Sequence, residues 1–258
     1  MLVENPVINV FLIIFIAVIS CLLLYLAVLL LTFVFLLLLT LTVRKNKKYK
    51  NFSRFYYNLY ITICRFICFV CRVKIHVSGL EKLPTDKCFL LVSNHRSNFD
   101  NIIQGIVLRK TPIAYISKKE NFKIPFAGRL VNRCLFISID RGHMKSALES
   151  IHQATEYVST GLMSVGVFPE GKRSKNCELL PFKPGCFKIA EKGKCPLVIS
   201  TVRGTQKIHK NVPFKKTHVY IDFLEVLPSE VTSSTKTVEL CRISAEKVAA
   251  FLADKKES

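Results

Sequence analysis

The first part of the chain is almost continuously apolar. Across residues 7–43 only Asn9, Ser20, Tyr25 and three threonines interrupt the run, and no charged residue occurs. This run is far longer than the ~20 residues with which a helix crosses a bilayer. It predicts a membrane-embedded helical anchor over residues 1–43, as one span with an extension or as a hairpin that bends near Ser20.

The flanks of the apolar run indicate how it is used. A secretory signal peptide would have a basic segment before an apolar core of ~7–15 residues, and this run is longer and has no basic residue before it. Residues 44–50 follow with several lysines and an arginine. Short basic flanks remain cytoplasmic, so we expect a membrane-anchored protein whose remaining chain faces the cytosol.

A second pattern of apolar positions recurs at helical spacing over residues 52–70. Its apolar members are Phe52, Phe55, Tyr56, Leu59, Ile63, Phe66, Ile67 and Val70. Basic residues such as Arg54 and Arg65 recur on the opposite face, which is typical of an amphipathic helix. We expect residues 44–72 to form a basic amphipathic helix in the membrane interface, with its aromatic side toward the lipid. The alternative is an ordinary helix packed on the following domain.

Residues 73–258 alternate between short apolar runs and helical periodicity. Strands are predicted near 73–77, 88–93, 113–117, 162–168, 196–202 and 219–226. Helices are predicted from about residue 99, over 144–159 and 185–191, and over 238–252. Such alternation indicates an α/β fold with a mostly parallel sheet flanked by helices. The length suits a single catalytic domain, residues 73–258.

The net charge identifies the expected partner. The chain has 38 Lys and Arg against 18 Asp and Glu, and every basic residue lies beyond the apolar run. Residues 44–80 contain no acid and directly follow the anchor, where anionic lipid headgroups attract basic side chains. No nucleic-acid-binding motif accompanies the charge. We therefore expect membrane lipids as partners and no nucleic acid.

Ten cysteines fit reduced thiols in the cytosol, where disulfides are rare. Cys64, Cys68 and Cys71 have a C-x3-C-x2-C spacing that also occurs in cluster-binding enzymes. An iron–sulfur site needs a loop that can wrap three thiolates around a cluster, and these cysteines lie on the predicted amphipathic helix. We therefore expect no metal site here.

Candidate chemistry begins where the strand near 88–93 ends. His95 follows that strand, and Asp100 lies five residues later, in the first turn of the next predicted helix. In open α/β sheets this crevice position is favoured for ligands. A histidine can serve as a general base, and a neighbouring carboxylate can hold its tautomer and stabilise its protonated form. The pair is therefore able to remove a proton from a hydroxyl group.

Three further short segments follow the His95–Asp100 segment in order. They are residues 136–141, ending in Arg141, residues 168–174, which read Phe-Pro-Glu-Gly-Lys-Arg-Ser, and residues 195–200. Together the four segments resemble the glycerolipid acyltransferase family, and the 1-acylglycerol-3-phosphate acyltransferases in particular, over roughly residues 75–205. The last segment departs from the family pattern, because Ile199 stands where the family commonly has a second proline.

The resemblance implies roles for residues beyond the His95–Asp100 pair. The acceptor site around the glycerol phosphate would contain Arg141, Glu170, Gly171 and Arg173. Arginine suits phosphate because its contacts are bidentate, and glycine lets the backbone approach a ligand. Glu170 is expected to contact the acceptor or an arginine, and Lys119 to help bind phosphate. Asn94 is expected to shape the turn or to help place the reacting groups in the substrate site.

The expected activity is transfer of a fatty acyl group from a thioester to the sn-2 hydroxyl of lysophosphatidic acid, giving phosphatidic acid for phospholipid synthesis. Acyl-CoA or acyl-carrier protein would be the donor, and no cofactor is expected. The same chemistry on another lysophospholipid or on glycerol 3-phosphate remains open. So do a thioesterase, in which water replaces the alcohol, and a non-catalytic membrane adaptor that uses only the basic surface.

Overall fold

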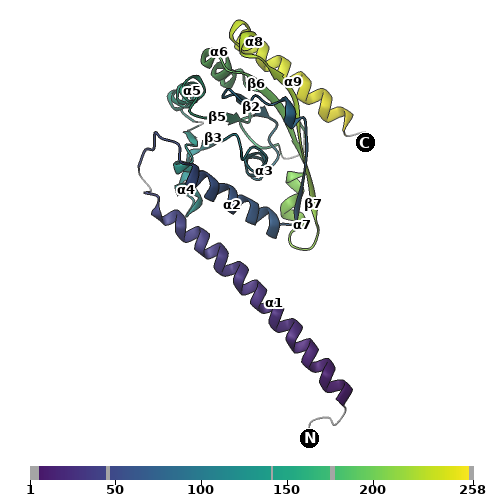
Figure 1. The fold of residues 1–258 in the computed structure, drawn as a ribbon. Coiled ribbons are helices and arrows are strands. Elements are labelled where there is room, and N and C mark those ends of the chain that lie inside the picture. The colour runs from purple at the N-terminus through teal and green to yellow at the C-terminus, as the bar shows by residue number, and fades with distance from the viewer. Residues whose placement is uncertain (1–5, 45–46, 141, 175–177, 256–258) are drawn as a thin grey trace. The chain divides into compact units, whose positions relative to one another are not determined.

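A computed structural model describes residues 6–44, 47–140, 142–174 and 178–255. The chain divides into two compact units, Met1–Thr42 and Val43–Ser258. The first is dominated by one helix, and the second contains a seven-stranded sheet with helices on both faces (Figure 1).

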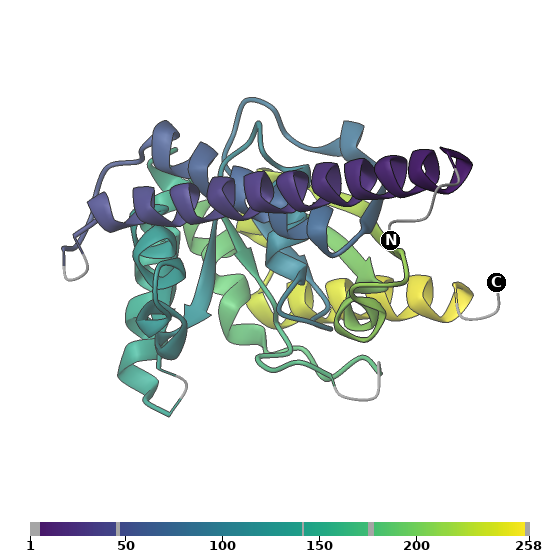
Figure 2. The same ribbon diagram turned by 90° about the horizontal axis from the view of Figure 1, so that it is seen from below.

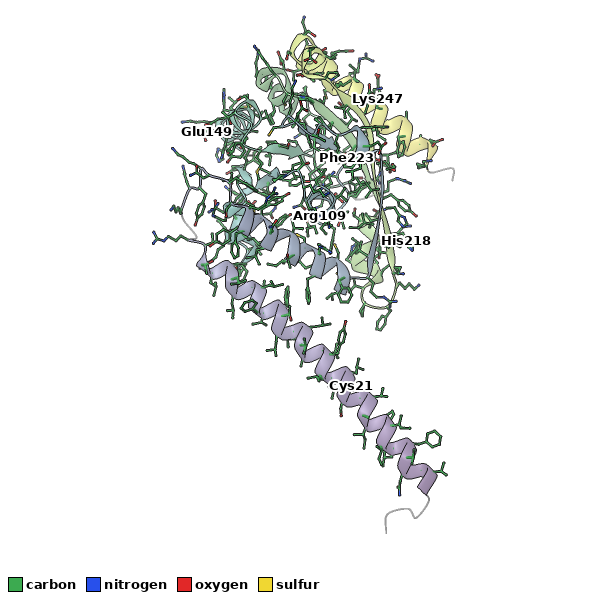
Figure 3. The ribbon with its side chains drawn as sticks, in the orientation of Figure 1. Cys21, Arg109, Glu149, His218, Phe223 and Lys247 are labelled. Carbon is green, nitrogen blue, oxygen red and sulfur yellow. The ribbon has the colours of Figure 1, made fainter. Side chains whose placement is uncertain are left out.

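The first unit contains α1 (Pro6–Leu39), followed by the short 3-10 helix η1 (Thr40–Thr42). α1 is continuous through Ser20, so the hairpin alternative is wrong. Its 34 residues rise ~51 Å, more than the ~30 Å hydrocarbon core of a bilayer. Side chains project from it on all sides (Figure 3). By length and composition α1 is able to cross a membrane.

The sheet of the second unit has the strand order β1-β7-β6-β2-β5-β3-β4. The strands are β1 (Val73–Ser78), β2 (Leu90–Ser93), β3 (Ile113–Lys118), β4 (Ile137–Ile139), β5 (Ser164–Val167), β6 (Leu197–Arg203) and β7 (Thr217–Leu227). Only β6 and β7 pair antiparallel among the described strands. The predicted, mostly parallel α/β sheet is confirmed, and β1 and β7 run against the other five strands.

The central strands are buried on both faces, which explains their continuous apolar runs. Every residue of β2 and of β5 is buried, as are all residues of β6 except its last, Arg203. A parallel strand covered by helices on both sides has no polar face and therefore does not alternate. The edge strand β1 is instead half-buried or exposed along its length.

Helices cover the sheet in two layers (Figure 1). The α-helices of this unit are α2 (Arg54–Val70), α3 (Asp100–Val107), α4 (Ala127–Arg133), α5 (Met144–Ser159), α6 (Lys188–Gly193), α7 (Ile208–Asn211), α8 (Ser229–Ser234) and α9 (Thr237–Asp254). The 3-10 helices are η2 (Leu80–Lys82), η3 (Lys119–Lys123), η4 (Pro184–Phe187) and η5 (Thr205–Lys207). α2, α3 and α4 lie on one face, and α5, α6 and α9 on the other. From below, teal α4 and α5 lie at one end and yellow α9 toward the other (Figure 2).

The face of the amphipathic helix that was expected to contact lipid is partly covered by the domain. Much of the apolar side of α2 packs against α3 and α4, with Tyr57, Leu59 and Ile63 buried. The Tyr57 hydroxyl accepts a hydrogen bond from the amide of Ile113 at 3.2 Å. Phe55 is exposed. Of the eight apolar residues predicted to face lipid, only Leu59 and Ile63 are buried, and the other six are half-buried or exposed. Part of the predicted face therefore packs on the domain, and contact of the rest with lipid stays a prediction.

Candidate active site

The residues singled out in the sequence follow the carboxyl ends of parallel strands. His95 comes two residues after β2, Lys119 directly follows β3, and Glu170 lies three residues after β5. Because β2, β5 and β3 are neighbours and run parallel, their carboxyl ends meet at one edge of the sheet. This edge is the crevice position that favours ligands in α/β proteins.

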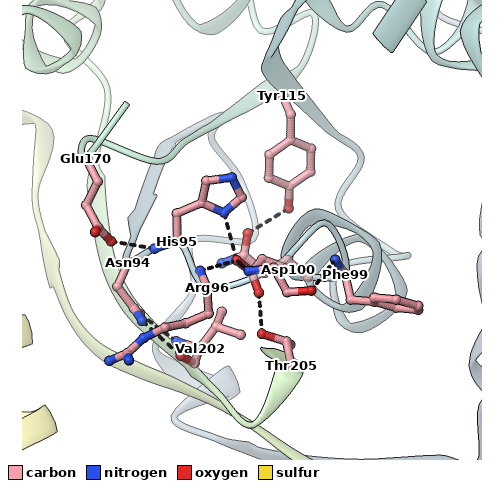
Figure 4. A network of polar contacts seen from close by, with 11 residues as sticks. Asn94, His95, Arg96, Phe99, Asp100, Tyr115, Glu170, Val202 and Thr205 are labelled. Atoms are coloured by element: carbon pink, nitrogen blue, oxygen red, sulfur yellow. Dashed lines mark hydrogen bonds and ion pairs between the residues drawn. The ribbon is translucent and has the colours of Figure 1, made fainter. Parts of the chain in front are cut away.

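His95 and Asp100 are in hydrogen-bonding contact at this edge. His95 Nδ1 lies 2.7 Å from Asp100 Oδ2, and the imidazole retains 16% side-chain exposure whereas Asp100 is fully buried (Figure 4). With its proton on Nδ1, the imidazole donates to the carboxylate, and Nε2 is then the nitrogen able to accept a proton. The geometry is that of a general base oriented by an acid.

Further donors hold the Asp100 carboxylate. The amides of Arg96 and Ser97 donate to Oδ2 at 2.6 and 2.8 Å, and the hydroxyl of Thr205 donates to Oδ1 at 2.5 Å. Hydrogen bonds to the charged form stabilise a buried carboxylate. The carboxylate is therefore fixed in position on both of its oxygens before any substrate binds.

Asn94 connects the end of β2 to β6. Its side-chain amide donates to the carbonyl of Val202 at 2.9 Å, and its Oδ1 accepts from the Val202 amide at 2.8 Å. Asn94 is fully buried. Its side chain thus continues the hydrogen bonding between these strands where β2 ends, and it holds the turn from which His95 projects.

A stack of rings supports the imidazole. The ring of Phe168 lies 4.2 Å from that of His95 with 14° between their planes, and Tyr115 stacks on Phe168 at 6.0 Å. Tyr115 also donates to Gln104 Oε1 at 3.1 Å, and burial raises the pKa of its hydroxyl well above the usual value. Opposite Tyr115, Gly166 leaves room for the ring, since a Cβ there would lie 2.4 Å from Tyr115 Cε1.

Glu170 links two loops through backbone amides. Its Oε1 accepts from the amide of His95 at 2.6 Å, and its Oε2 accepts from the amide of Leu180 at 3.0 Å. Burial raises the pKa of this carboxyl group, and the two amide hydrogen bonds oppose that shift. Both oxygens therefore serve the protein scaffold in this state. Contact between Glu170 and an acceptor or an arginine stays a prediction.

The loop that carries Gly171 and Arg173 lies against His95. The amide of Ser174 donates to the carbonyl of His95 at 3.0 Å, so the backbone that follows Arg173 is held against the backbone of His95. Gly171 adopts φ of +70°, a left-handed conformation that glycine adopts without strain. The Arg173 side chain is exposed, which leaves it accessible to an anionic ligand.

Of the two remaining predicted phosphate ligands, the structure describes Lys119, which directly follows β3. Arg141 falls outside the described residues. Lys119 forms an ion pair with Asp140, which raises the pKa of the lysine and lowers that of the carboxyl group. Both side chains are at least partly exposed. Lys119 thus lies at the same edge of the sheet and is paired with an acid in this state.

The three cysteines with the cluster-like spacing lie at α2. Cys64 and Cys68 are buried in its packed face, and burial raises the pKa of each of these thiols to about 12. Cys71 directly follows the helix, and its pKa is also raised by burial. Metals bind the thiolate form, so these surroundings oppose coordination. Within the described residues, no group of three or more His, Cys, Asp or Glu is placed to hold a metal ion.

Comparison with known proteins tests the resemblance. The family model described as Acyltransferase matches residues 74–202, which is half of the chain. The chain belongs to the acyltransferase family. The matched range contains His95, Asp100, the Glu170 loop and strands β2 to β5, so the candidate site lies within the part that this acyltransferase shares with its family.

Curated relatives extend the comparison. The chain is 38% identical over 136 residues to a chloroplastic 1-acyl-sn-glycerol-3-phosphate acyltransferase, BAT2, of Brassica napus, covering 52% of this chain and 39% of that protein. It is 30% identical over 162 residues to the human 1-acyl-sn-glycerol-3-phosphate acyltransferase alpha, covering 61% and 56%. The chain thus spans between two fifths and three fifths of the length of these two relatives.

A solved structure has the same fold. The crystal structure of the 1-acyl-sn-glycerophosphate acyltransferase PlsC from Thermotoga maritima matches with a TM-score of 0.62 at 22% identity. The match covers 87% of this chain and 88% of the other. It confirms the α/β architecture expected for an acyltransferase of this family.

Two residues that support the site, Thr205 and Tyr115, were not predicted, because nothing in their sequence spacing links them to His95 or Asp100. Thr205 lies 105 residues after Asp100 yet donates to its carboxylate. Tyr115 supports the imidazole through Phe168 from a neighbouring strand. Phe168 differs from these two, since it begins the segment that resembles the family pattern. Its stacking on the His95 ring is nevertheless visible only in the structure.

Proposed function

We propose that this protein transfers a fatty acyl group from a thioester to the sn-2 hydroxyl of 1-acyl-glycerol 3-phosphate, giving phosphatidic acid. The observation that carries the proposal is the contact of His95 Nδ1 with the buried Asp100 carboxylate, which leaves Nε2 as a base. Family membership and the names of the curated relatives agree with this substrate.

The residues support the following steps. His95 Nε2 takes the proton of the acceptor hydroxyl as its oxygen attacks the thioester carbonyl carbon. The new C–O ester bond forms, the C–S bond breaks, and the leaving thiolate receives the proton from the imidazolium. Asp100 stabilises the imidazolium between these events. The substrate supplies the nucleophile, so no acyl-enzyme forms, and the activated thioester makes a cofactor unnecessary.

The acceptor phosphate would lie on the β5 side of His95. Arg173 is exposed there, and the amide of the following residue is bonded to the His95 carbonyl. A bidentate arginine contact to phosphate would place the neighbouring hydroxyl near the imidazole. Arg141 and Lys119 follow the adjacent strands and belong to the same proposed acceptor region.

Membrane anchoring fits such a lipid substrate. α1 is long and apolar enough to cross a bilayer, and the basic residues that follow it would interact with anionic headgroups on the cytoplasmic face. An acceptor with one acyl chain is itself held in the membrane. Anchoring therefore confines enzyme and acceptor to the same surface.

The test uses the full chain in detergent micelles or nanodiscs. Two donors are supplied, acyl-CoA and acyl-carrier protein, each bearing a labelled acyl group. Each donor is combined with lysophosphatidic acid, another lysophospholipid or glycerol 3-phosphate. We expect phosphatidic acid as the main product and a loss of about 10²–10⁴-fold in kcat for His95→Ala, because general base catalysis contributes that much. His152→Ala, at an exposed position of α5, is the matched control.

Three outcomes would contradict the proposal. Full activity of His95→Ala would remove the assigned base. Release of free fatty acid at the same rate without any acceptor would indicate a thioesterase. An intact wild-type protein that transfers no acyl group from either donor would favour a membrane adaptor.

A further inference from the structure

A second feature at the catalytic edge is a cavity of about 560 Å³ on the β6 and β7 side of His95. Five cationic side chains line it: Arg96, Arg203, Lys207, Lys216 and Lys255. No Asp or Glu is among the described residues that line it. We call it the basic cavity. Its charge favours a ligand with several negative charges.

The fold places the basic cavity directly beside the catalytic pair. Arg96 follows His95 in the chain, and Arg203 ends β6, the strand next to β2. Lys216 directly precedes β7. The second residue of β7, His218, also lines the cavity and is labelled in Figure 3. Lys207 ends η5, and the first residue of the same short helix, Thr205, donates to Asp100. One short segment therefore contacts both the catalytic carboxylate and the cavity.

The Arg203 side chain is held by neighbouring residues of the cavity wall, yet not all of its hydrogen-bond donors have a partner among the described residues. The guanidinium lies 4.9 Å from the ring of Tyr220 and 5.6 Å from that of Phe251, and its Nη2 is 3.1 Å from Asp222 Oδ2. Its Nε and the Gln206 Oε1 are buried without a hydrogen-bond partner in the part of the chain that the structure describes. A buried donor without an acceptor is uncommon in folded proteins. An oxyanion in the cavity would supply the acceptor that Arg203 lacks.

We propose that the basic cavity binds the nucleotide phosphates of a coenzyme A thioester, the acyl donor. The inference rests on the proposed function, which requires a thioester and an acceptor to reach His95 together. The acceptor phosphate is assigned to the β5 side, so a donor must approach from another direction, and the basic cavity lies on the opposite side. Coenzyme A carries a diphosphate and a 3′-phosphate, which match a site with five cations.

The alternative donor suits the cavity less well. The prosthetic arm of an acyl-carrier protein carries a single phosphodiester, and most of the positive charge in the cavity would remain unmatched. The acceptor's phosphomonoester would likewise use only a part of it. Both remain outcomes of the test.

The experiment compares two double variants of the full-length protein with the same change in charge. Lys207→Gln/Lys216→Gln removes two exposed cations that line the cavity, and Lys210→Gln/Lys215→Gln removes two exposed neighbours that do not. Initial rates are measured with acyl-CoA, with its 3′-dephospho form, with an S-acyl pantetheine that lacks the nucleotide, and with acyl-carrier protein bearing the same acyl group. KM for the lysophosphatidic acid acceptor is measured in parallel.

We expect the first variant to raise KM for acyl-CoA at least tenfold, because each lost contact to a charged phosphate weakens binding. The effect should be smaller with 3′-dephospho acyl-CoA and absent with S-acyl pantetheine. KM for the acceptor and every constant of the Lys210/Lys215 control should stay within twofold of wild type.

Other results overturn the proposal. An unchanged KM for acyl-CoA, or equal losses with the truncated thioester, would exclude nucleotide binding in the cavity. A rise in KM for the acceptor alone would assign the cavity to the lipid phosphate, and a selective loss with acyl-carrier protein would assign it to that donor. Binding of adenosine 3′,5′-bisphosphate to the wild type, weakened at least tenfold in the first variant alone, tests the cavity even if no acyl transfer is detected.

Discussion

Asp100 and Arg173 lie at the same edge of the sheet, and their surroundings are opposite. Asp100 is fully buried, and the His95 ring, two backbone amides and the Thr205 hydroxyl contact its oxygens. Arg173 is exposed in a loop. The fold thus fixes the proposed proton-transfer group in place, whereas the proposed phosphate ligand Arg173 can adjust to the substrate. Catalysis needs the first to be fixed within a narrow geometry, and binding of a flexible lipid tolerates the second.

Among the following variants, the largest loss of kcat should come from Asp100→Asn, which changes the buried carboxylate. An amide nitrogen cannot accept the bonds that the carboxylate oxygens accept, so the imidazole loses its orientation and its charge stabilisation. We expect kcat to fall by roughly 10³-fold, within the range for loss of general base catalysis. Steady-state kinetics at saturating substrates measure this, with circular dichroism to check folding. A fall of less than threefold would show that Asp100 does not orient the base.

On the exposed side, Arg173→Ala should change binding more than rate. Loss of contacts to a charged phosphate costs ~1.5–3 kcal/mol, which corresponds to roughly 10–150-fold in KM for the lysophosphatidic acid acceptor. The measurement is KM for acceptor and for donor separately. Lys172→Ala, an exposed cation in the same loop, is the control. A drop in kcat with KM unchanged would place Arg173 among the groups that act on the transition state.

Thr205→Val tests whether the hydrogen bond from the Thr205 hydroxyl to Asp100 contributes to the rate. Valine matches the size of threonine but removes the hydroxyl that donates to Asp100 Oδ1. We expect kcat to fall roughly tenfold at unchanged KM, because a bond to a charged group is lost. Thr205→Ser keeps the hydroxyl and should restore at least half of the activity. If serine and valine behave alike, the hydroxyl has no positioning role.

The smallest effect on rate is expected for Gly166→Ala, which acts on the imidazole only through Tyr115 and Phe168. The new Cβ would lie 2.4 Å from Tyr115 Cε1, so the ring must shift within a packed core. We expect the free energy of unfolding to fall by about 1–3 kcal/mol and kcat by a few fold. Urea unfolding and kinetics measure the two effects. Gly185→Ala, whose Cβ would lie 3.9 Å from Ile151 Cδ1, should be close to neutral.

Several elements of the fold followed from sequence patterns alone. The periodicity over residues 144–159 predicts a helix that coincides with α5, Met144–Ser159. The apolar runs predict β2, β5 and β6 to within a few residues. The three-residue β4 and the helix α4 were not predicted as elements, because each is too short for a period to show.

The amphipathic helix shows the limit of such patterns. Periodicity located α2 within two residues of its start, yet it could not distinguish lipid from protein as the medium that covers the apolar face. Both media favour the same side chains. The structure buries Leu59 and Ile63 of this face against the domain and leaves Phe55 and Val70 exposed, and this division depends on where α3 and α4 lie.

The sequence by itself determined the chemistry of this protein: an apolar anchor, a histidine five residues before an aspartate, and an arginine-bearing loop, because these are local properties of residue type and spacing. Only the tertiary structure decided how the pair is held. Thr205 and Glu170 reach the site across 105 and 75 residues of chain. Parallel strands bring their carboxyl ends to one edge regardless of separation in sequence, and for this reason the supporting hydrogen bonds and the basic cavity emerge only when the sheet is assembled.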